Sequence, residues 1–260
     1  MRFKLTLSAD RSHAVLPVNY AYPLSAAIYR IIAKGDAQYT SFLHETGYGK
    51  GFKFFTFSQI DCPFRVEGDR LLLLSNELHF QVAFHLPQAT AHFVKGLFQS
   101  EQIDIADKKS GATFSIRTVE SLPDPLAGRK NSEILHVILR PLSPVVSGMK
   151  NERGNYNFLA PDNPLFADNL IYNWRNKIGA GYDAVQAEKA LLMAEVLSLK
   201  HPFKSRLMAI KAGTPEETKI RGWLNLGLSV TAEKRFVELL LNAGAGLYNS
   251  MGCGMMEVRG

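Results

Sequence analysis

Apolar and polar residues alternate at the start of the chain. Residues 2–8 read Arg, Phe, Lys, Leu, Thr, Leu, Ser, and this period of two is typical of a strand with one buried face. Apolar residues then recur at helical spacing from Leu24 to Ile31, and this helix is expected to end at Gly35. Asp36 is placed to cap a second, shorter helix that runs to Gly47. The pattern therefore predicts one strand followed by two helices.

The rest of the first half alternates between strand-like and helix-like segments. Runs of aromatic and branched residues predict three strands, the last two as a hairpin, at 52–60, 70–75 and 77–85. A helix opened by proline follows from Pro87 to Gln99. Extended segments are predicted at 101–105 and 113–120. This order is close to the split βαββαβ pattern of a ferredoxin-like domain.

The second half repeats this order after a stretch at 121–132 that is rich in proline, glycine and charge. The repeated segments are a strand at 133–140, helices near 162–178 and 183–200, a strand pair at 203–211 and 219–230, a helix capped by Thr231 and ended by Gly244, and a last strand at 255–259. We therefore expect an α+β fold of two tandem ferredoxin-like (RRM-like) βαββαβ domains. Their expected limits are residues 1–125 and 130–260, and the second domain carries a glycine-rich loop.

Charge and cysteine content restrict the class of protein. The 30 Lys and Arg residues outnumber the 24 Asp and Glu residues, and the pI near 9.2 favours a polyanionic partner, with nucleic acid ahead of a membrane surface. Two cysteines are too few for a disulfide framework or a four-cysteine zinc site. No apolar segment reaches the roughly 20 residues that span a bilayer. We expect a soluble cytoplasmic protein without a membrane partner.

A glycine-rich loop precedes the last predicted strand. The sequence GAGLYNSMGCG at 244–254 follows a helix and enters a strand, whereas a nucleotide-binding fingerprint follows a strand and opens a helix. The loop is therefore no nucleotide-binding motif. Its glycines indicate either a long turn that needs positive φ or backbone N–H groups that approach a phosphate chain.

Three residues near the first two helices form a candidate catalytic group. Tyr29 lies beside the apolar stripe of the first helix, and His44 lies on the polar side of the second. His44 is in the last turn, where the helix dipole favours an imidazolium. Lys53 is expected to share a strand face with two phenylalanines, a setting that suits phosphate and base stacking. The structural alternatives are packing for Tyr29, solvation for His44 and protection of a strand edge for Lys53.

Basic pairs and histidines elsewhere give weaker signals. His79 and His85 share a strand face, but no third ligand is spaced to join them, so a metal site is not predicted. Each basic pair alone indicates a solvated face, and together, beside two tryptophans, the pairs could line an RNA track. The pairs are Arg129 with Lys130, Lys150 with Arg153, Arg175 with Lys177, and Lys204 with Arg206.

Several segments of the chain together resemble those of a known family, the CRISPR repeat-RNA endoribonucleases of the RAMP superfamily. Members of this family cut precursor CRISPR RNA within each repeat. The resemblance lies in the C-terminal GAGLYNSMGCGMMEVRG and in MRFKLTL, AIYRII, SFLHE, KFFTFS and PLSPVV. It implies the tandem ferredoxin-like fold, a metal-independent nuclease without a cofactor, and CRISPR repeat RNA as substrate. Subunits of a CRISPR effector complex and a second copy of the chain are further candidate partners.

The resemblance also implies roles for particular residues. Tyr29, His44 and Lys53 match the family's catalytic triad, with Lys50 as a competitor for the lysine role. His44 and Tyr29 would share the acid and base roles during attack by the RNA 2′-hydroxyl, and the lysine would stabilise the phosphorane. The products would be a 2′,3′-cyclic phosphate and a 5′-hydroxyl. The expected RNA-binding residues are Lys50, Ser143, Lys150, Arg153, Lys204, Arg206, Gly244, Gly246, Asn249, Ser250, Gly252 and Gly254.

Two other functions fit the same sequence. One is a non-catalytic RNA-binding subunit of the RAMP superfamily, which would have no need of an acid/base pair beside a basic loop. The other is a two-domain protein-interaction module whose basic excess is incidental. RNA binding that is absent or insensitive to salt would indicate the module.

Overall fold

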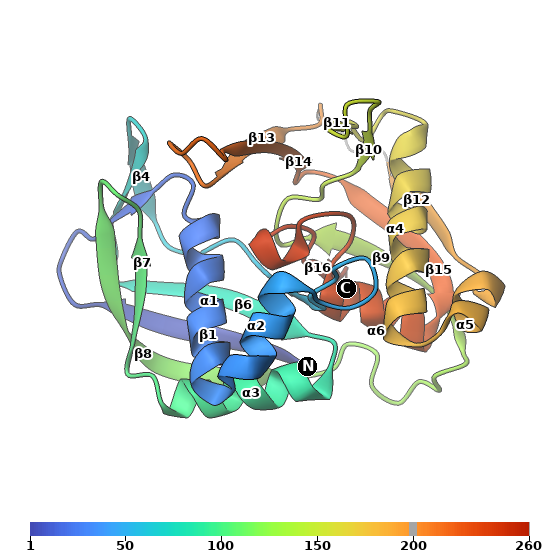
Figure 1. Ribbon diagram of the computed structural model, residues 1–260, viewed down its shortest axis with the longest axis horizontal. Coiled ribbons are helices and arrows are strands. Elements are labelled where there is room, and N and C mark those ends of the chain that lie inside the picture. The colour runs from blue at the N-terminus through green and yellow to red at the C-terminus, as the bar shows by residue number, and fades with distance from the viewer. Residues whose placement is uncertain (198–201, 260) are drawn as a thin grey trace.

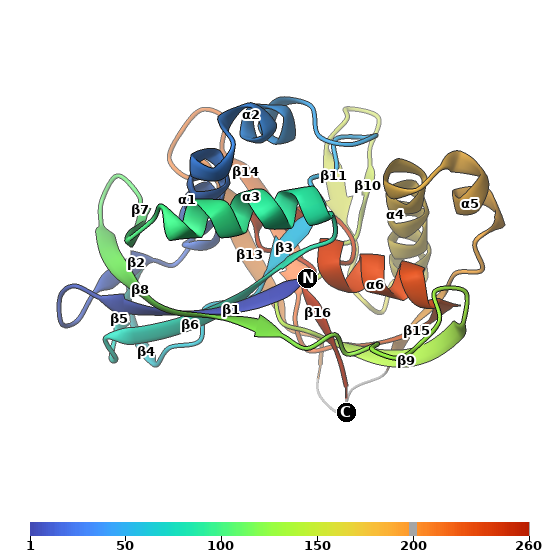
Figure 2. The same cartoon turned by 90° about the horizontal axis from the view of Figure 1, so that it is seen from below.

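Two antiparallel sheets lie next to each other in the computed structural model, which describes residues 1–197 and 202–259. The sheets form one layer, and helices cover the face that looks toward the top of Figure 2. Phe3, Leu5 and Leu7 of the first strand are buried, because their period of two points them all to the covered face.

The first sheet has the order β3-β6-β1-β8-β7. Its strands are β1 (Arg2–Ala9), β3 (Phe55–Phe57), β6 (Glu77–Phe84), β7 (Gln102–Ala106) and β8 (Gly111–Leu122). The helices of this half are α1 (Ala21–Gly35), α2 (Ala37–Glu45) and α3 (Pro87–Phe98). Helices α1 and α3 approach closely, since a Cβ on Gly96 would lie 1.7 Å from the Ile31 carbonyl oxygen.

The second sheet repeats the arrangement with the order β12-β15-β9-β16. Its strands are β9 (Ile134–Pro141), β12 (Met193–Leu197), β15 (Gly227–Glu233) and β16 (Met256–Val258), and its helices are α4 (Leu165–Gly181), α5 (Ala184–Lys189) and α6 (Lys234–Ala243). In both sheets the first strand lies between the third strand and the last strand in chain order, and the second strand lies beyond the third, as in a βαββαβ unit; β7 is an additional edge strand of the first sheet. The predicted tandem ferredoxin-like α+β fold is confirmed, whereas the limits 1–125 and 130–260 stay a prediction.

Three smaller sheets are present in the described residues besides the two main sheets. They are the sheet β2-β5-β4, made of β2 (Val15–Pro17), β5 (Arg70–Leu73) and β4 (Phe64–Glu67), and the hairpins β10 (Gly148–Lys150) with β11 (Tyr156–Phe158) and β13 (Ser205–Ile210) with β14 (Thr218–Trp223). The prediction that 70–75 and 77–85 form one hairpin is wrong. Both edges of β6 are already paired, with β1 and β3, so β5 pairs with β2 and β4 instead.

Three predictions for the second half are also wrong. The helix expected at 183–200 ends at Lys189, and β12 follows because it pairs with β15; residues 198–200 lie outside the described residues. The strand expected at 219–230 is two strands, β14 and β15, which belong to different sheets. Thr231 lies within β15 opposite His136, and the residue before α6 is Glu233. Pairing with distant strands decides these segments over their local propensity.

The two halves are joined by a buried arginine. Arg2 of β1 is 7% exposed and donates from its guanidinium to the backbone oxygens of Leu241, at 2.7 Å, and of Met256. The first strand of one half is therefore fastened to the end of α6 and to the last strand of the other. None of the helices in residues 1–197 and 202–259 is both long and apolar enough to cross a membrane.

Candidate active site

The side chains of Tyr29 on α1 and His44 on α2 lie next to each other. Asp36 separates the two helices and accepts a hydrogen bond at 2.8 Å from the Tyr39 N–H, so α2 begins directly after α1 ends. The Tyr29 and His44 rings meet edge to face, with centroids 5.8 Å apart. Tyr29 is buried and also touches Phe55, whereas His44 is exposed. The tyrosine thus forms the floor of this site and the histidine its rim.

Burial affects the phenol of Tyr29. It raises the pKa of this phenol to about 12, and the neighbouring Ser250 side chain opposes this rise. A phenol holds its proton at neutral pH even at its usual pKa near 10, and burial extends this to higher pH. In this site Tyr29 can donate a hydrogen bond or a proton, but it is a poor base.

Lys53 follows α2 in the chain, and its ammonium group reaches back to the C-terminal end of that helix. Its Nζ donates to the backbone oxygen of His44 at 3.2 Å, and burial lowers the pKa of its ammonium group. A Cβ on Gly47 would lie 2.9 Å from this Nζ, so a glycine leaves room for the lysine. Lys50 points elsewhere, because its Nζ donates to the Tyr172 hydroxyl at 3.0 Å. The structure places Lys53, and not Lys50, beside His44.

The strand predicted around Lys53 is shorter than expected. Only Phe55–Phe57 form β3, because the preceding Phe54 has a φ of 53° and breaks the extended backbone. Lys53 is therefore outside the strand, and the prediction that it shares a strand face with Phe55 and Phe57 is wrong. The kink directs Phe54 into the core of the second half.

The glycine-rich loop connects α6 to β16 and contains a short 3₁₀ turn, η1 (Asn249–Met251). It is held to the first half by two hydrogen bonds, from Ser25 Oγ to the Ser250 oxygen at 2.6 Å and from Thr56 Oγ1 to the Cys253 oxygen at 2.9 Å. These contacts bring Ser250 against Tyr29. The loop is thus part of the site although α6 and β16 belong to the second half.

The glycines of this loop are buried and have positive φ. A Cβ on Gly246 would lie 2.1 Å from the Val146 oxygen, and one on Gly254 would lie 1.9 Å from the Ala245 oxygen. The N–H groups of Gly244, Gly252 and Gly254 donate to backbone oxygens of the protein itself. Close packing accounts for these residues, and the RNA contacts expected of Gly244, Gly246, Gly252 and Gly254 stay a prediction.

Lys177 of α4 is buried under the glycine-rich loop and donates hydrogen bonds to it. The sequence, in which Lys177 forms a basic pair with Arg175, indicated a solvated face instead. The Lys177 side chain is 1% exposed. Nζ donates to the Gly244 oxygen at 2.6 Å, the Gly246 oxygen at 3.1 Å and Asn249 Oδ1 at 2.6 Å. The first acceptor lies at the C-terminus of α6, where the helix dipole favours a cation. The sequence gives one hint of this role, since Lys177 falls on the same helical face as the buried Trp174 and Ile178.

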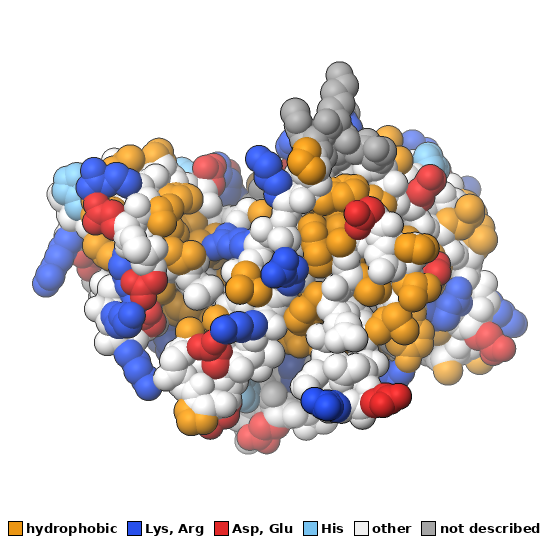
Figure 3. Space-filling model, turned by 90° about the horizontal axis from the view of Figure 1, so that it is seen from above, with side chains coloured by type: hydrophobic (Ala, Val, Ile, Leu, Met, Phe, Trp, Pro, Cys, Tyr) orange, Lys and Arg blue, Asp and Glu red, His pale blue; other side chains and the backbone are white. Residues whose placement is uncertain are grey.

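The other expected RNA-binding residues lie in several places. Ser143 is fully buried, and its Oγ accepts a hydrogen bond from the Met255 N–H at 2.9 Å. Arg206 donates to the Val18 oxygen at 3.0 Å and lies over the Tyr20 ring. Lys204 and Arg153 are exposed. Figure 3 shows Lys and Arg side chains scattered among apolar patches over the upper face of the molecule.

Two adjoining cavities lie beside the candidate site, and of the three candidate catalytic residues Lys53 alone lines one of them. The first, about 350 Å³, is lined by Lys53, Lys177 and Ser250 among others, and the second, about 470 Å³, is lined by Lys50 and Lys150. Both are also lined by Phe52, Asn173, Gly246 and Leu247. A continuous hollow therefore leads from Lys53 to the β10–β11 hairpin.

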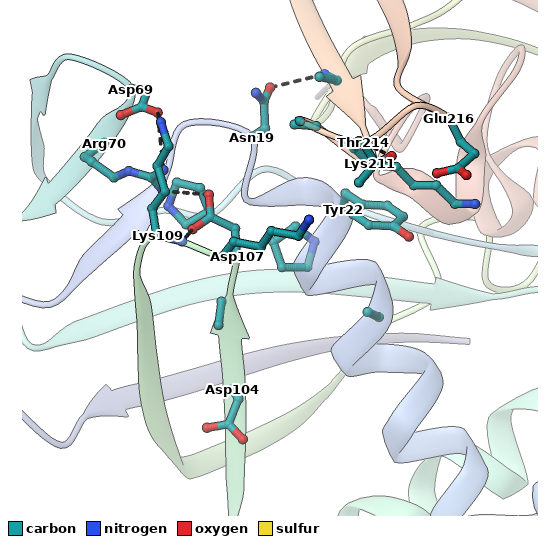
Figure 4. Close-up of a pocket in the computed structure, with 18 of the residues that line it drawn as sticks. Asn19, Tyr22, Asp69, Arg70, Asp104, Asp107, Lys109, Lys211, Thr214 and Glu216 are labelled. Atoms are coloured by element: carbon teal, nitrogen blue, oxygen red, sulfur yellow. Dashed lines mark hydrogen bonds and ion pairs between the residues drawn. The ribbon is translucent and has the colours of Figure 1, made fainter.

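A larger cavity of about 1000 Å³ lies apart from this hollow (Figure 4). Carboxylates offset much of the positive charge in its wall, since Arg70 pairs with Asp107 at 2.8 Å and Lys109 pairs with Asp69 at 2.9 Å, and Asp104 and Glu216 also line it. Carboxylates among the basic residues weaken any preference for a polyanion. No cluster of three His, Cys, Asp or Glu side chains suited to a metal ion occurs in the described part of the chain.

Known proteins share both halves of the chain. The family descriptions "CRISPR-associated protein Cas6, N-terminal" and "CRISPR associated protein Cas6, C-terminal" match residues 15–119 and 128–258. The protein named "CRISPR-associated endoribonuclease Cas6 1" from Methanocaldococcus jannaschii is 28% identical over 260 residues, which cover 98% of this chain and 92% of that protein.

Solved structures agree with this relationship. One described as "CRISPR associated protein Cas6" is 25% identical with a TM-score of 0.73, covering 100% of this chain and 99% of its own. A Cas6-related protein from Pyrococcus furiosus is 20% identical with a TM-score of 0.79, covering 100% of this chain and 98% of its own, and supports the fold. The resemblance found in the sequence is confirmed, and the chain belongs to the Cas6 family of CRISPR-associated endoribonucleases.

Proposed function

We propose that this protein cuts precursor CRISPR RNA within its repeats, without a metal ion, by attack of the RNA's own 2′-hydroxyl. The observation that carries the proposal is the meeting of Tyr29, His44 and Lys53, the last of which lines one end of a hollow that is also lined by other lysines. Membership of a family of endoribonucleases supports it. CRISPR repeat RNA is then the principal partner, and effector-complex subunits and a second copy of the chain stay predictions.

Each of the three side chains has one task in this reaction. His44 takes the proton of the 2′-hydroxyl, whose oxygen forms a bond to the adjacent phosphorus. Lys53 stabilises the negative charge of the phosphorane. The bond to the 5′-oxygen then breaks, and Tyr29, whose phenol is protonated at neutral pH, donates the proton that this oxygen needs. The products are a 2′,3′-cyclic phosphate and a 5′-hydroxyl.

The test uses CRISPR repeat RNA from the organism that encodes the chain, in excess EDTA. Intact RNA is compared with RNA that carries one 2′-deoxy sugar at the cut. Cleavage of the intact RNA alone supports the proposal. Cleavage of both RNAs would exclude attack by the 2′-hydroxyl, and tight binding without any cleavage would indicate the non-catalytic RNA-binding subunit.

A substitution tests the assignment of His44. His44→Ala is expected to lower the cleavage rate by about a hundredfold to ten-thousandfold, the usual contribution of a proton-transfer group, with little loss of RNA affinity. His136→Ala is the matched control, because His136 is also exposed but lies on β9. An undiminished rate in His44→Ala would remove the histidine from the mechanism.

A further inference from the structure

The wider part of the hollow has the chemistry of a nucleotide site. We call it the α4 groove: the cavity of about 470 Å³ between the face of α4, the β10–β11 hairpin and the chain at Lys50 and Phe52. Among the described residues that line it, Lys50 and Lys150 are the only charged ones and none is acidic. The cavity in Figure 4 differs, since aspartates and a glutamate accompany its lysines and arginines. Of these two cavities, the α4 groove is the one that favours a polyanion.

The α4 groove is also lined by aromatic rings and side-chain amides, which are the groups that can recognise a base. Tyr172 is 61% exposed although it is a large aromatic residue, and Lys50 Nζ lies 5.1 Å from its ring centroid. Across the groove, Lys150 Nζ lies 5.7 Å from the ring centroid of Tyr156. Each wall thus offers a ring for stacking with a lysine beside it, the combination with which proteins bind single-stranded nucleic acid.

The amides follow the same face of α4. Asn169, Asn173 and Asn176 recur at helical spacing and all line the groove. Asn169 and Asn176 donate to backbone oxygens of their own helix, at 2.9 and 2.8 Å, so their oxygens remain as acceptors. An Asn amide reads the edge of a base through paired donor and acceptor groups.

Asn173 is the amide best placed to respond to a ligand. Its Oδ1 is buried and accepts no hydrogen bond from any described residue. An unpaired buried acceptor is unfavourable. The terminal torsion of an asparagine is broad and twofold, so a base edge in the groove can turn this amide and satisfy it. Asn173 also borders the smaller cavity at Lys53, which places it between the groove and the active site.

We propose that the α4 groove holds one unpaired base of the RNA, stacked on Tyr172 and read by Asn173, next to the nucleotides at the cut. The inference rests on the proposed function, because it assigns a subsite to the same substrate. Lys50 and Lys150 neutralise the phosphates that flank this base. The groove thereby contributes base selectivity that the triad itself does not provide.

The test measures binding, which is independent of cleavage. Repeat RNA with a 2′-deoxy sugar at the cut, or unmodified RNA if no cut occurs, is made abasic at one position at a time. For wild type, one abasic position is expected to weaken binding about fivefold to a hundredfold, the contribution of a stacked base. In Tyr172→Ala the same abasic position is expected to have almost no further effect.

Asn173→Ala separates reading from stacking. It is expected to retain the abasic penalty but to bind the four bases at that position with nearly equal affinity. Gln88→Ala, an exposed amide on α3, is the matched control and keeps both properties. Abasic penalties of the same size in wild type and Tyr172→Ala would overturn the proposal. So would a uniform loss of affinity for every RNA in Tyr172→Ala, because it would indicate a contact to the backbone alone.

Discussion

Lys177 shows how one buried side chain supports the glycine-rich loop. Its ammonium group donates only to neutral oxygens, those of Gly244, Gly246 and Asn249. Lys177→Met removes the donor but leaves the acceptors buried. We expect the free energy of unfolding at pH 7 to fall by about 2–4 kcal/mol, because unpaired buried polar groups cost about 1–3 kcal/mol each and such losses are not additive. Urea denaturation measures it, and Lys108→Met, at an exposed lysine, is the control.

The effect of Lys177 on stability depends on pH. Burial lowers its pKa from 10.5 to about 7 in the folded protein. Between these values the unfolded chain holds the proton and the folded chain has begun to lose it, so the free energy of unfolding rises with pH. We expect this rise between about pH 7 and pH 10 in wild type and its loss in Lys177→Met. Parallel pH profiles for the two proteins would contradict a lowered pKa.

At the scale of elements, the path of the glycine-rich loop depends on backbone contact. Gly246 has a φ of 69°, and a Cβ there would lie 2.1 Å from the Val146 oxygen. Gly246→Ala therefore adds both backbone strain and a clash, which would displace the loop and move Ser250 away from Tyr29. We expect a clearly lower melting temperature and at least a tenfold slower cleavage.

Gly128→Ala is the matched control for this prediction. Gly128 has a φ of 80°, but nothing lies within 4 Å of a Cβ at that position. This substitution adds backbone strain alone, which costs about 1 kcal/mol. Equal losses of stability in the two variants would show that close packing at Gly246 has no energetic role.

Elements with a clear local signal could be predicted from the sequence. Their signals lie within the element itself or directly before it. They are the alternation in β1, the apolar stripe of α1, the cap of α2 at Asp36 and the proline at the start of α3. β12 could not be predicted as a strand, because its state depends on pairing with β15. The division of 219–230 into β14 and β15 likewise depends on two separate sheets.

The candidate site could be predicted in part for the same reason. Tyr29, His44 and Lys53 lie close together in sequence, so a family pattern can predict them as a group, and their side chains lie together in the structure. Lys177 and its acceptor Gly244 are 67 residues apart, so no local pattern connects them. The excess of basic residues predicts a negatively charged partner. It does not show which cavity favours that partner, because this depends on the carboxylates that pack beside the basic residues in the cavity of Figure 4 and are absent from the described lining of the α4 groove.

At the scale of the whole molecule, the site depends on the docking of the two halves. Tyr29, His44 and Lys53 come from the first half, whereas Ser250 and Lys177 come from the second. Arg2 connects the two halves, because it donates hydrogen bonds to the backbone oxygens of Leu241 and Met256. These two residues lie at the two ends of the segment that carries the glycine-rich loop. Arg2 is thus placed to set where that segment lies relative to α1.

Arg2→Met tests this connection. The substitution leaves two buried backbone oxygens without their donor, so we expect the free energy of unfolding to fall by about 2–4 kcal/mol. We also expect cleavage to slow at temperatures where both halves are still folded, because the loop loses its fixed position against Tyr29.

Calorimetry and cleavage together decide the outcome. Wild type is expected to unfold in one transition, and Arg2→Met in a broader or divided one, since the weakened junction lets one half unfold before the other. Arg11→Met is the control, because Arg11 is exposed near the end of the same strand. If Arg2→Met loses stability but still unfolds in one sharp transition and cleaves at the wild-type rate, the arginine supports packing only and does not place the loop. If the rate falls while Arg11→Met is unaffected, the position of the glycine-rich loop against α1 is controlled by the first strand of the chain.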